Sequence, residues 1–381
     1  MQQTASLDEV LTGLRELAAK PLHQATAPPK DIYTSDEVCA HEMERIFHHE
    51  WICAGRSDEI ANNGDYMTFE LGTQPLIILR DLDGKLAARS NICRHRMMRL
   101  VEGRGNTRKF TCPYHAWTYN LQGELVAAAY MDKTSCFDKS DIQLPAVRCE
   151  EYFGWIYVSL NADAKPVAEL LADLTPKLVP YDMARYETIF TEEHVWDTNW
   201  KCLTENFMEG YHLPVAHRDT VGAFFPVMET VFDDTGSHDA YTSQLFIKNN
   251  DAPIGTAHPS NTTLTGKWRQ TSLMPTVFPT HMYVLAPDHL WYLSLQPDGA
   301  GKTKIRYGAA IAPEVLADQP DRTAYIAETK EFLDRVQEED RHVVEGIYQG
   351  ALSPLGKSGP LSWLERENHE FAQYLARRMC A

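Results

Sequence analysis

Two short pairs of cysteine and histidine are the clearest candidates for chemistry in this sequence. The first pair lies in Cys93-Arg94-His95, and the second lies in Cys112-Pro113-Tyr114-His115. One thiolate and one imidazole from each of two loops make a set of four metal ligands. A single zinc ion could take all four tetrahedrally. A cluster of two irons and two sulfides could take both cysteines on one iron and both histidines on the other. We favour the iron cluster, because one residue between Cys and His is unlike the common zinc spacings.

A second set of ligand types lies further along the chain. Glu205, Glu209 and His212 are three or four residues apart, which predicts that they share one face of a helix. Pro214 should break that helix and let His217 come back beside His212. Two neutral imidazoles and one carboxylate on one side of an iron leave positions open for oxygen. That is the ligand set of the non-haem Fe(II) oxygenases.

The missing carboxylate is expected in the last long helix, where Asp340 occupies a slot of the apolar stripe. The other members of that stripe are Tyr325, Thr329, Phe332, Val336, Val343 and Ile347. A carboxylate buried there needs a cation or hydrogen-bond donors. The alternative is a salt bridge from Asp340 to Arg335 or Arg341. Glu338 and Glu339 fall off the stripe and are expected to face water.

Length, composition and charge bound the class of protein. The chain has 381 residues, enough for two or three domains, and its 44% apolar and 23% charged residues are typical of globular proteins. A net charge of −17 without a basic cluster argues against nucleic acid or a membrane as a partner. The start lacks the pattern of a signal peptide, and no apolar run approaches a membrane span. Eight cysteines are too sparse for a disulfide scaffold, so we expect a cytoplasmic protein.

The pattern of the first half predicts a small all-β unit between about 51 and 160. Its strands are expected at 67–71, 76–80, 86–90, 117–121, 125–128 and 152–160. A helix is predicted before it, at about 36–49.

The second half predicts helices packed against an antiparallel sheet, so the fold class expected for the chain is α+β. Strands are expected at 281–286, 290–295 and 303–311, and helices at about 167–178, 200–212 and 321–348. Residues 220–270 are rich in Gly, Asp, Asn and Thr and are expected to form long loops.

At the Cys/His pairs the chain resembles the Rieske non-haem iron oxygenases, the family of ring-hydroxylating oxygenase α subunits. The resemblance begins near Tyr33-Thr34-Ser35-Asp36-Glu37, covers both Cys/His segments and continues into the second half. It implies a Rieske [2Fe–2S] cluster held by Cys93, His95, Cys112 and His115. Met97 departs from the family pattern, which often has glycine there, so the shape of that loop is open to question.

The resemblance also assigns roles at the second site. The segment 206–217 matches the family's iron motif, Asn-x-x-acid-x-Tyr-His-x4-His. It implies that His212, His217 and Asp340 bind a mononuclear Fe(II). It implies that Glu209 links this iron to a cluster-ligand histidine of the neighbouring subunit. Asn206 matches a residue near the iron.

Domain plan and partners follow from the same resemblance. It implies an N-terminal segment, 1–40, packing on the catalytic domain, a Rieske domain at 41–160 and a helix-grip catalytic domain at 161–381. Electrons would cross between subunits through His115 or His95 and Glu209, which implies a homotrimer. The chain has no glycine-rich dinucleotide fingerprint and no ferredoxin-type cysteine run, so we expect a separate NAD(P)H-dependent flavin and iron–sulfur reductase.

The resemblance is nearest to members that act on betaine, choline or carnitine, because position 209 is Glu and the closing segment 359–365 matches them. It implies hydroxylation or oxidative N-demethylation, with O₂, of a small quaternary ammonium compound. A trimethylammonium group needs an aromatic cage. The candidates are Phe224, Phe225, Tyr283, Trp291 and Tyr292.

Two other functions stay open from the sequence. One is hydroxylation or O-demethylation of an aromatic acid whose carboxylate pairs with Lys248 or Arg269. The other is a zinc-stapled binding module that is not an enzyme. The choice between monooxygenation and dioxygenation also stays open.

Overall fold

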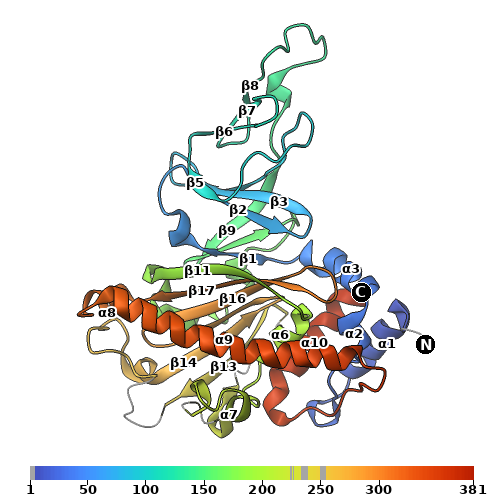
Figure 1. The fold of residues 1–381 in the computed structure, drawn as a ribbon, viewed down its shortest axis with the longest axis vertical. Coiled ribbons are helices and arrows are strands. Elements are labelled where there is room, and N and C mark those ends of the chain that lie inside the picture. Colours follow the sequence, from blue (N-terminus) through green and yellow to red (C-terminus); the bar gives the residue numbers. More distant parts are fainter. Residues whose placement is uncertain (1–4, 224, 226, 233–238, 249–254) are drawn as a thin grey trace. The chain divides into compact units, whose positions relative to one another are not determined.

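The computed structural model describes residues 5–223, 225, 227–232, 239–248 and 255–381 (Figure 1). The chain divides into two compact units. The small unit is Phe47–Glu169, and the large unit combines Met1–Ile46 with Leu170–Ala381. The small unit is built of strands, and the large unit packs helices on an antiparallel sheet. The predicted α+β class is therefore confirmed.

The small unit contains a seven-stranded and a three-stranded sheet, both antiparallel. The larger sheet, in spatial order, is β1 (Ile52–Arg56), β10 (Trp155–Ser159), β9 (Ala146–Tyr152), β4 (Leu86–Ser90), β3 (Gln74–Arg80), β2 (Asp65–Leu71) and β5 (Arg104–Asn106). The smaller sheet is β6 (Lys109–Thr111), β7 (Thr118–Asn120) and β8 (Leu125–Ala127). The strands predicted at 67–71, 76–80 and 86–90, and the hairpin from 117 to 128, are confirmed by β2, β3, β4 and β7–β8.

The strand predicted at 152–160 was wrong at its start. Tyr152 ends β9, and β10 begins at Trp155. Phe153 and Gly154 between them have φ of 49° and 81°. Two consecutive left-handed residues make the tight turn that suits a β-hairpin, and that turn usually carries Asn or Gly at its first position. Phenylalanine at this position hid the turn from sequence analysis.

The large unit holds a second seven-stranded antiparallel sheet. Its spatial order is β11 (Glu187–Trp196), β17 (Thr303–Ile311), β16 (His289–Pro297), β15 (His281–Leu285), β14 (Thr271–Val277), β13 (Tyr241–Ile247) and β12 (Val231–Phe232). The three strands predicted after residue 280 are confirmed. The prediction of loops across 220–270 was wrong at β13. Both faces of that strand are mostly buried, so its polar residues Thr242, Ser243 and Gln244 do not alternate with apolar ones.

Some of the helices of the described residues pack on this sheet, and others form the N-terminal segment (Figure 1). They are α1 (Leu7–Ala18), α2 (Asp31–Thr34), α3 (Asp36–Glu42), α4 (Val167–Leu170), α5 (Thr175–Leu178), α6 (Trp200–Phe207), α7 (Leu213–Ala216), α8 (Pro313–Ala317), α9 (Arg322–Leu352) and α10 (Arg366–Met379). The helix predicted at 36–49 is α3 plus a π-helical turn, Met43–Phe47. The helix predicted at 167–178 was wrong, because it is broken into α4 and α5.

The N-terminal segment belongs to the large unit and packs on its last helix. Gln373 of α10 donates a hydrogen bond to the carbonyl of Ala18, 3.2 Å away, and a ring nitrogen of His369 lies 2.9 Å from the carbonyl of Lys20. His41 makes a similar contact, 2.8 Å, with the carbonyl of Met379. Among the described helices, none is both long and apolar enough to cross a membrane.

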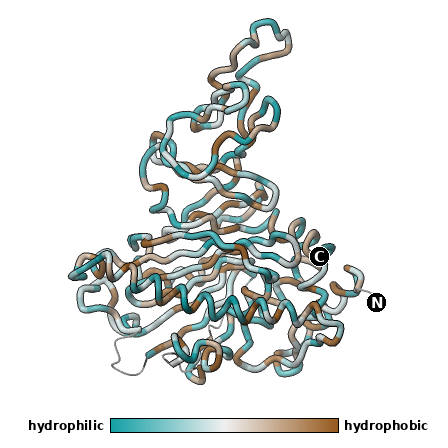
Figure 2. The backbone as a smooth tube through the Cα atoms, in the orientation of Figure 1, coloured by the Kyte–Doolittle hydropathy of each residue, from teal (hydrophilic) through white to brown (hydrophobic). Residues whose placement is uncertain are grey.

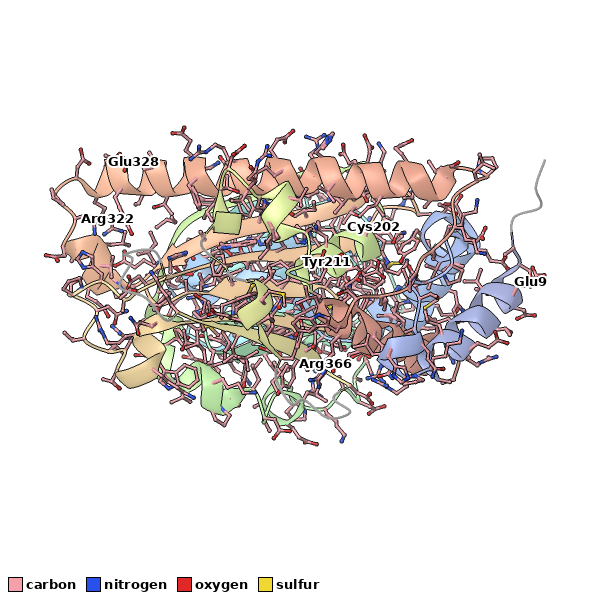
Figure 3. The ribbon with its side chains drawn as sticks, turned by 90° about the horizontal axis from the view of Figure 1, so that it is seen from below. Glu9, Cys202, Tyr211, Arg322, Glu328 and Arg366 are labelled. Atoms are coloured by element: carbon pink, nitrogen blue, oxygen red, sulfur yellow. The ribbon has the colours of Figure 1, made fainter. Side chains whose placement is uncertain are left out.

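The long helix α9 extends along one side of the large unit (Figure 3). Hydrophilic residues cover much of its length (Figure 2). Its buried residues are Leu333, Val336, Gln337, Asp340, Val344 and Tyr348. The predicted stripe was therefore right at Val336 and Asp340. It was wrong at Ile347, which is 48% exposed, because the buried face is turned by one residue toward Val344 and Tyr348.

Candidate metal centres

The two Cys/His loops of the small unit have the same backbone design. The amide of Cys93 donates to the carbonyl of Met98 and the amide of Met97 donates back to Cys93. Cys112 makes the same two bonds with Trp117 and Ala116, and each matching pair of distances is identical, at 2.8 and 3.0 Å. Each loop thus closes around its own cysteine.

The departure at Met97 leaves the loop shape intact. Met97 has φ of 58°, and Ala116, its counterpart in the second loop, has φ of 57°. Glycine adopts this left-handed conformation freely, whereas another residue pays about 1 kcal/mol for it. The side chain of Met97 is 82% exposed, so it meets no obstacle. The residue changes the strain in the loop and not its path.

The four ligand candidates of these loops come together in the arrangement that a two-iron cluster requires. Cys93 and Cys112 are buried in a hydrophobic cluster, while His95 and His115 are exposed. The two histidine Nδ1 atoms are 3.2 Å apart. Two nitrogen ligands on one tetrahedral metal, with bonds of about 2.0–2.1 Å, would be about 3.3 Å apart. The residues therefore fit the cluster, with the histidine end facing outward.

Buried aromatic residues support this site from below. The ring of His95 stacks on Trp117, with ring centres 4.6 Å apart. The hydroxyl of Tyr119 accepts a hydrogen bond from the amide of Arg94 and lies 3.4 Å from the sulfur of Cys93. Burial raises the pKa of the Cys93 thiol. A metal must therefore supply the charge that keeps this sulfur a thiolate.

The second candidate centre lies in the large unit, and its local structure differs from the prediction. Helix α6 ends at Phe207, so the predicted helix to residue 212 was wrong and Glu209 lies beyond the helix end. Pro214 occupies the first turn of α7, where proline starts a helix and does not break it. His212 and His217 are the two caps of this single helical turn. The turn holds both rings on one side, with centres 5.0 Å apart.

Gly222 allows the chain after His217 to pass close to α7. The amide of Gly222 donates to the carbonyl of His217 at 2.9 Å. A Cβ added at Gly222 would lie 2.2 Å from the carbonyl oxygen of Leu213. No side chain fits at this distance, so only glycine allows the chain to pass so close to α7.

Asp340 of α9 completes the centre. Its Oδ1 lies 3.0 Å from Nε2 of His217 and 3.6 Å from Nε2 of His212. One ligand atom from each of the three residues lies within 4.8 Å of the others. His217 is 2% exposed and Asp340 is 7% exposed. The set is the two-histidine, one-carboxylate arrangement suited to Fe(II). Among the described residues Asp340 pairs with these two histidines, and the alternative salt bridge to Arg335 or Arg341 is not formed.

Two further carboxylates orient the histidines. Oε1 of Glu209 lies 2.7 Å from Nδ1 of His212, and Oε2 of Glu339 lies 2.7 Å from Nδ1 of His217. Thr220 donates a second hydrogen bond to Glu339 at 2.6 Å. Carboxylates on Nδ1 fix each ring with Nε2 toward the metal position. The expectation that Glu339 faces water was wrong, because the buried face of α9 turns its side chain toward His217.

The charges of this centre are mutually dependent. Burial lowers the pKa of His212, but hydrogen bonds with Asp340 and Glu209 outweigh it and raise that pKa to about 10. Burial raises the pKa of Asp340, but the two histidines outweigh it and lower that pKa. Metal binding must displace the protons from these imidazoles.

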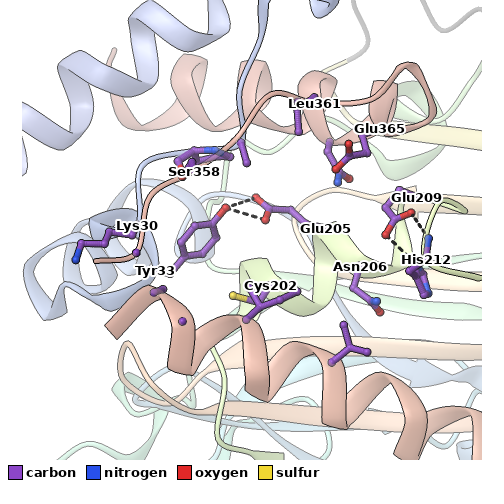
Figure 4. Close-up of a pocket in the computed structure, with 18 of the residues that line it drawn as sticks. Lys30, Tyr33, Cys202, Glu205, Asn206, Glu209, His212, Ser358, Leu361 and Glu365 are labelled. Carbon is purple, nitrogen blue, oxygen red and sulfur yellow. Dashed lines mark hydrogen bonds and ion pairs between the residues drawn. The ribbon is translucent and has the colours of Figure 1, made fainter. Parts of the chain in front are cut away.

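A cavity of about 510 Å³ opens beside His212 (Figure 4). Glu205, Asn206 and Glu209 also line it, and Asn206 is 6% exposed. Residues of α9 and of the segments near 30 and 357 form its other walls. The structure therefore brings Asn206 to the cavity that contains Glu209 and His212.

The cage candidates fall on two different faces of the sheet. Trp291 contacts Phe207 of α6, with ring centres 5.6 Å apart, so it faces the side of the histidines. Tyr283 and Tyr292 pair with each other across β15 and β16. Neighbouring residues of a strand point to opposite faces, so both tyrosines face away from α6. Their assignment to the pocket was wrong.

Two other aromatic candidates have different outcomes. Phe225 contacts Phe246, on the same sheet face as Trp291, with ring centres 5.2 Å apart. Phe224 lies outside the described residues.

One basic candidate for an aromatic acid, Arg269, has another structural role. The guanidinium of Arg269 donates to four backbone carbonyls, those of Ala257, His258, Asn261 and Leu264. It is therefore committed to holding its own loop. Lys248 follows β13, and its amide donates to the carbonyl of Gln270 at 2.9 Å.

Comparison with known proteins assigns both units. Residues 50–138 match the family model of the Rieske [2Fe-2S] domain, and residues 183–381 match that of the ring hydroxylating alpha subunit catalytic domain. The glycine betaine monooxygenase oxygenase subunit of Chromohalobacter salexigens is 34% identical over 242 residues, which are 62% of this chain and 54% of that protein. The chain thus spans about half the length of the curated relatives it matches first.

Solved structures of two kinds of oxygenase have the same fold as this chain. The quaternary ammonium Rieske monooxygenase CntA in complex with L-carnitine has a TM-score of 0.81 and 24% identity, covering 95% of this chain and 98% of that chain. Naphthalene 1,2-dioxygenase from Rhodococcus sp. also has a TM-score of 0.81, with 23% identity and 98% of both chains covered. The chain belongs to the family of ring-hydroxylating oxygenase α subunits, which join a Rieske [2Fe–2S] domain to a catalytic domain for mononuclear iron.

Proposed function

We propose that this chain is the terminal oxygenase of a multicomponent system that hydroxylates or oxidatively N-demethylates a small quaternary ammonium compound. The observation that carries the oxygenase assignment is the convergence of His212, His217 and Asp340 within 4.8 Å, in a chain that also has a Rieske domain. The substrate class rests on the likeness to a glycine betaine monooxygenase subunit.

Each metal group has a proposed set of ligands. Cys93, His95, Cys112 and His115 hold the cluster, within residues 41–160. His212, His217 and Asp340 hold the iron, within residues 161–381, and residues 1–40 pack on that part. When bound, the two groups supply electron transfer and oxygen activation. The protein supplies orientation, through Glu209 and Glu339 on the histidine Nδ1 atoms, and a water-poor site around Asp340 and His217.

Glu209 has a second proposed role as the link between subunits. Its carboxylate accepts from the amide of His212 and contacts the ring of the same residue, at 3.0 and 2.7 Å, and it also lines an open cavity. A cluster-ligand histidine of a neighbouring copy, His95 or His115, can reach such a carboxylate because both histidines are exposed. A homotrimer satisfies this link symmetrically. Asn206 contributes from the wall of the same cavity.

The electrons come from a separate reductase that uses NAD(P)H, flavin and an iron–sulfur centre. The basis for this partner is the absence of a dinucleotide fingerprint and of a ferredoxin-type cysteine run in the sequence. A reducing compartment such as the cytoplasm suits the eight cysteines, since none of them forms a disulfide and two are proposed cluster ligands.

Trp291 and Phe225 remain the cage candidates, although neither lines the cavity beside His212. Both lie on the sheet face that meets α6, and each packs on another aromatic ring. A trimethylammonium group is attracted to such faces without any hydrogen bond. The competing aromatic-acid function loses one of its two cationic candidates, because Arg269 is bonded to four carbonyls.

Reductase-coupled oxygen uptake tests the assignment. The panel holds glycine betaine, choline, carnitine and matched compounds with a tertiary amine or a tert-butyl group in place of trimethylammonium, and it includes benzoates. We expect uptake with a quaternary compound, and formaldehyde release if a methyl carbon is attacked. Uptake with benzoates alone would overturn the substrate class. Purified protein that is colourless and contains zinc would overturn the oxygenase assignment.

A further inference from the structure

Glu205 forms an unusual pair with Tyr33 in the wall of the cavity beside His212 (Figure 4). The Tyr33 hydroxyl donates to the Glu205 carboxylate, whose two oxygens are 2.8 and 3.1 Å away. Glu205 comes from α6 and Tyr33 from α2, so the pair joins the N-terminal segment to the helix that leads into the iron motif. Glu209 and His212 line the same cavity.

The surroundings of Glu205 bring its titration near neutrality. Burial raises its pKa to about 7, although the hydrogen bond from Tyr33 and the charge of Lys201 pull it down, and Glu365 pushes it further up. Lys201 is itself paired with Glu42 at 2.6 Å, and both side chains are fully buried.

Other titratable groups face this region. They are Cys202 beside it on α6, Glu209 and Glu365 across the cavity, and Lys30 and Lys357 on its outer walls. Lys30 donates to the carbonyl of Ser353 at 2.6 Å. The carboxylate Oε2 of Glu365 accepts from the amide of Ser362 at 2.6 Å and so caps a helical turn. The pKa of Glu205, about 7, suits proton exchange near neutral pH.

The reaction proposed above consumes protons. Insertion of one oxygen atom into a C–H bond takes O₂, two electrons and two protons, and yields the hydroxylated product and water. These protons must reach a centre whose members Asp340 and His217 are 7% and 2% exposed. The Nδ1 atoms of both histidines are occupied by carboxylates, so the rings are poorly placed to carry protons in.

We propose that Glu205, oriented by Tyr33, is the proton relay of this oxygenase. It gives a proton to water in the cavity, toward Glu209 and His212, and takes one back from solvent, so it is unchanged after each turnover. A cavity of about 510 Å³ holds several waters at about 30 Å³ each. The proposal rests on the proposed oxygenase function.

A direct titration tests the group itself without turnover. Infrared difference spectra of the iron-free protein should show a carboxyl C=O band that disappears as pH rises through about 7. The band should be missing in Glu205→Gln. In Tyr33→Phe it should persist to higher pH, because loss of the hydrogen bond destabilises the carboxylate. A band that survives in Glu205→Gln, or that does not move in Tyr33→Phe, would overturn the assignment.

Turnover tests the role. In the reconstituted holoenzyme, Glu205→Gln should lower kcat by about 100-fold with little change in KM, and Glu205→Asp should recover part of it. The wild-type kcat should fall as pH rises through the infrared midpoint, and Tyr33→Phe should move this fall upward. Glu365→Gln, which can keep its helix cap, is the matched control. It should retain kcat at low pH, and its fall in kcat should begin at a slightly lower pH than in the wild type, because Glu365 no longer raises the pKa of Glu205.

The infrared titration and the turnover assay together distinguish a failure of the proposed relay from a failure of the proposed oxygenase function. A normal kcat and pH profile in Glu205→Gln, or an equal loss in Glu365→Gln, would overturn the relay. If the wild-type holoenzyme oxidised no compound of the panel, the proposed function would fail, while the infrared band would still report on Glu205.

Discussion

The two candidate metal centres are assembled in opposite ways. The cluster site uses two loops with the same hydrogen bonds, and each loop carries its own Cys and His. The iron site uses both caps of one helical turn and a carboxylate from α9, more than 100 residues later. The cluster histidines are exposed, whereas His217 is 2% exposed. A centre that exchanges electrons with a partner needs an exposed edge, and a centre that handles oxygen needs shelter from water.

The largest difference between the two centres is expected when Asp340, the iron ligand from α9, is removed. Asp340→Ala should lose the mononuclear iron and all turnover, because two imidazoles alone are left to hold the metal. The cluster should remain, since its four ligands lie in the small unit. Iron content and the electron paramagnetic resonance spectrum of the reduced protein measure both. Iron at the wild-type stoichiometry would place the third ligand elsewhere.

Changing Glu209, the proposed link between subunits, should leave both metals bound and stop electron transfer between them. Glu209→Gln can keep a hydrogen bond to His212 but loses the negative charge. With excess iron we expect both metals at full content, and kcat should be lower by about 100-fold. Stopped-flow oxidation of the pre-reduced cluster should slow in parallel. Normal turnover would contradict the bridging role.

Changing Glu339 should lower the affinity for the mononuclear iron and leave electron transfer unchanged. Glu339→Gln weakens the orientation of His217, so the affinity for iron should fall about 10- to 100-fold. Glu338→Gln is the matched control, because the Glu338 side chain is 76% exposed and its loss of charge should not affect the metal. Equal affinities in the two variants would show that Glu339 does not support His217.

The smallest effect is expected for glycine substitutions in the two Cys/His loops. They test whether the two loops have the same backbone design. Met97→Gly and Ala116→Gly both remove strain at a left-handed residue, worth about 1 kcal/mol, and both add chain entropy to the unfolded state. The two variants should keep the cluster and change the free energy of unfolding by less than about 1 kcal/mol. Loss of the cluster in one variant alone would contradict the shared design.

The same contrast explains what the sequence could predict. The cluster ligands lie within two short segments, so their spacing alone pointed to Cys93, His95, Cys112 and His115. Asp340 was singled out because a carboxylate in an apolar stripe is conspicuous. Glu339, next to it, was misjudged, because the stripe was one residue out of register with the buried face.

Other errors came from information that only the folded chain contains. The face of the sheet that meets α6 separates Trp291 from Tyr283 and Tyr292, and the segment from 281 to 295 reads the same for either face. Pro214 was expected to end a helix, but α6 had already ended at Phe207, so the same residue starts α7. The role of a proline in a helix depends on where the helix begins.

The central claim is that one chain holds two iron centres of different kinds. Iron and sulfide analysis, with electron paramagnetic resonance of the dithionite-reduced protein, tests it most directly. The account predicts two irons and two sulfides in a cluster with a Rieske signal, and a third iron that is lost in Asp340→Ala. Zinc in place of iron, or a reduced protein without a Rieske signal, would contradict it.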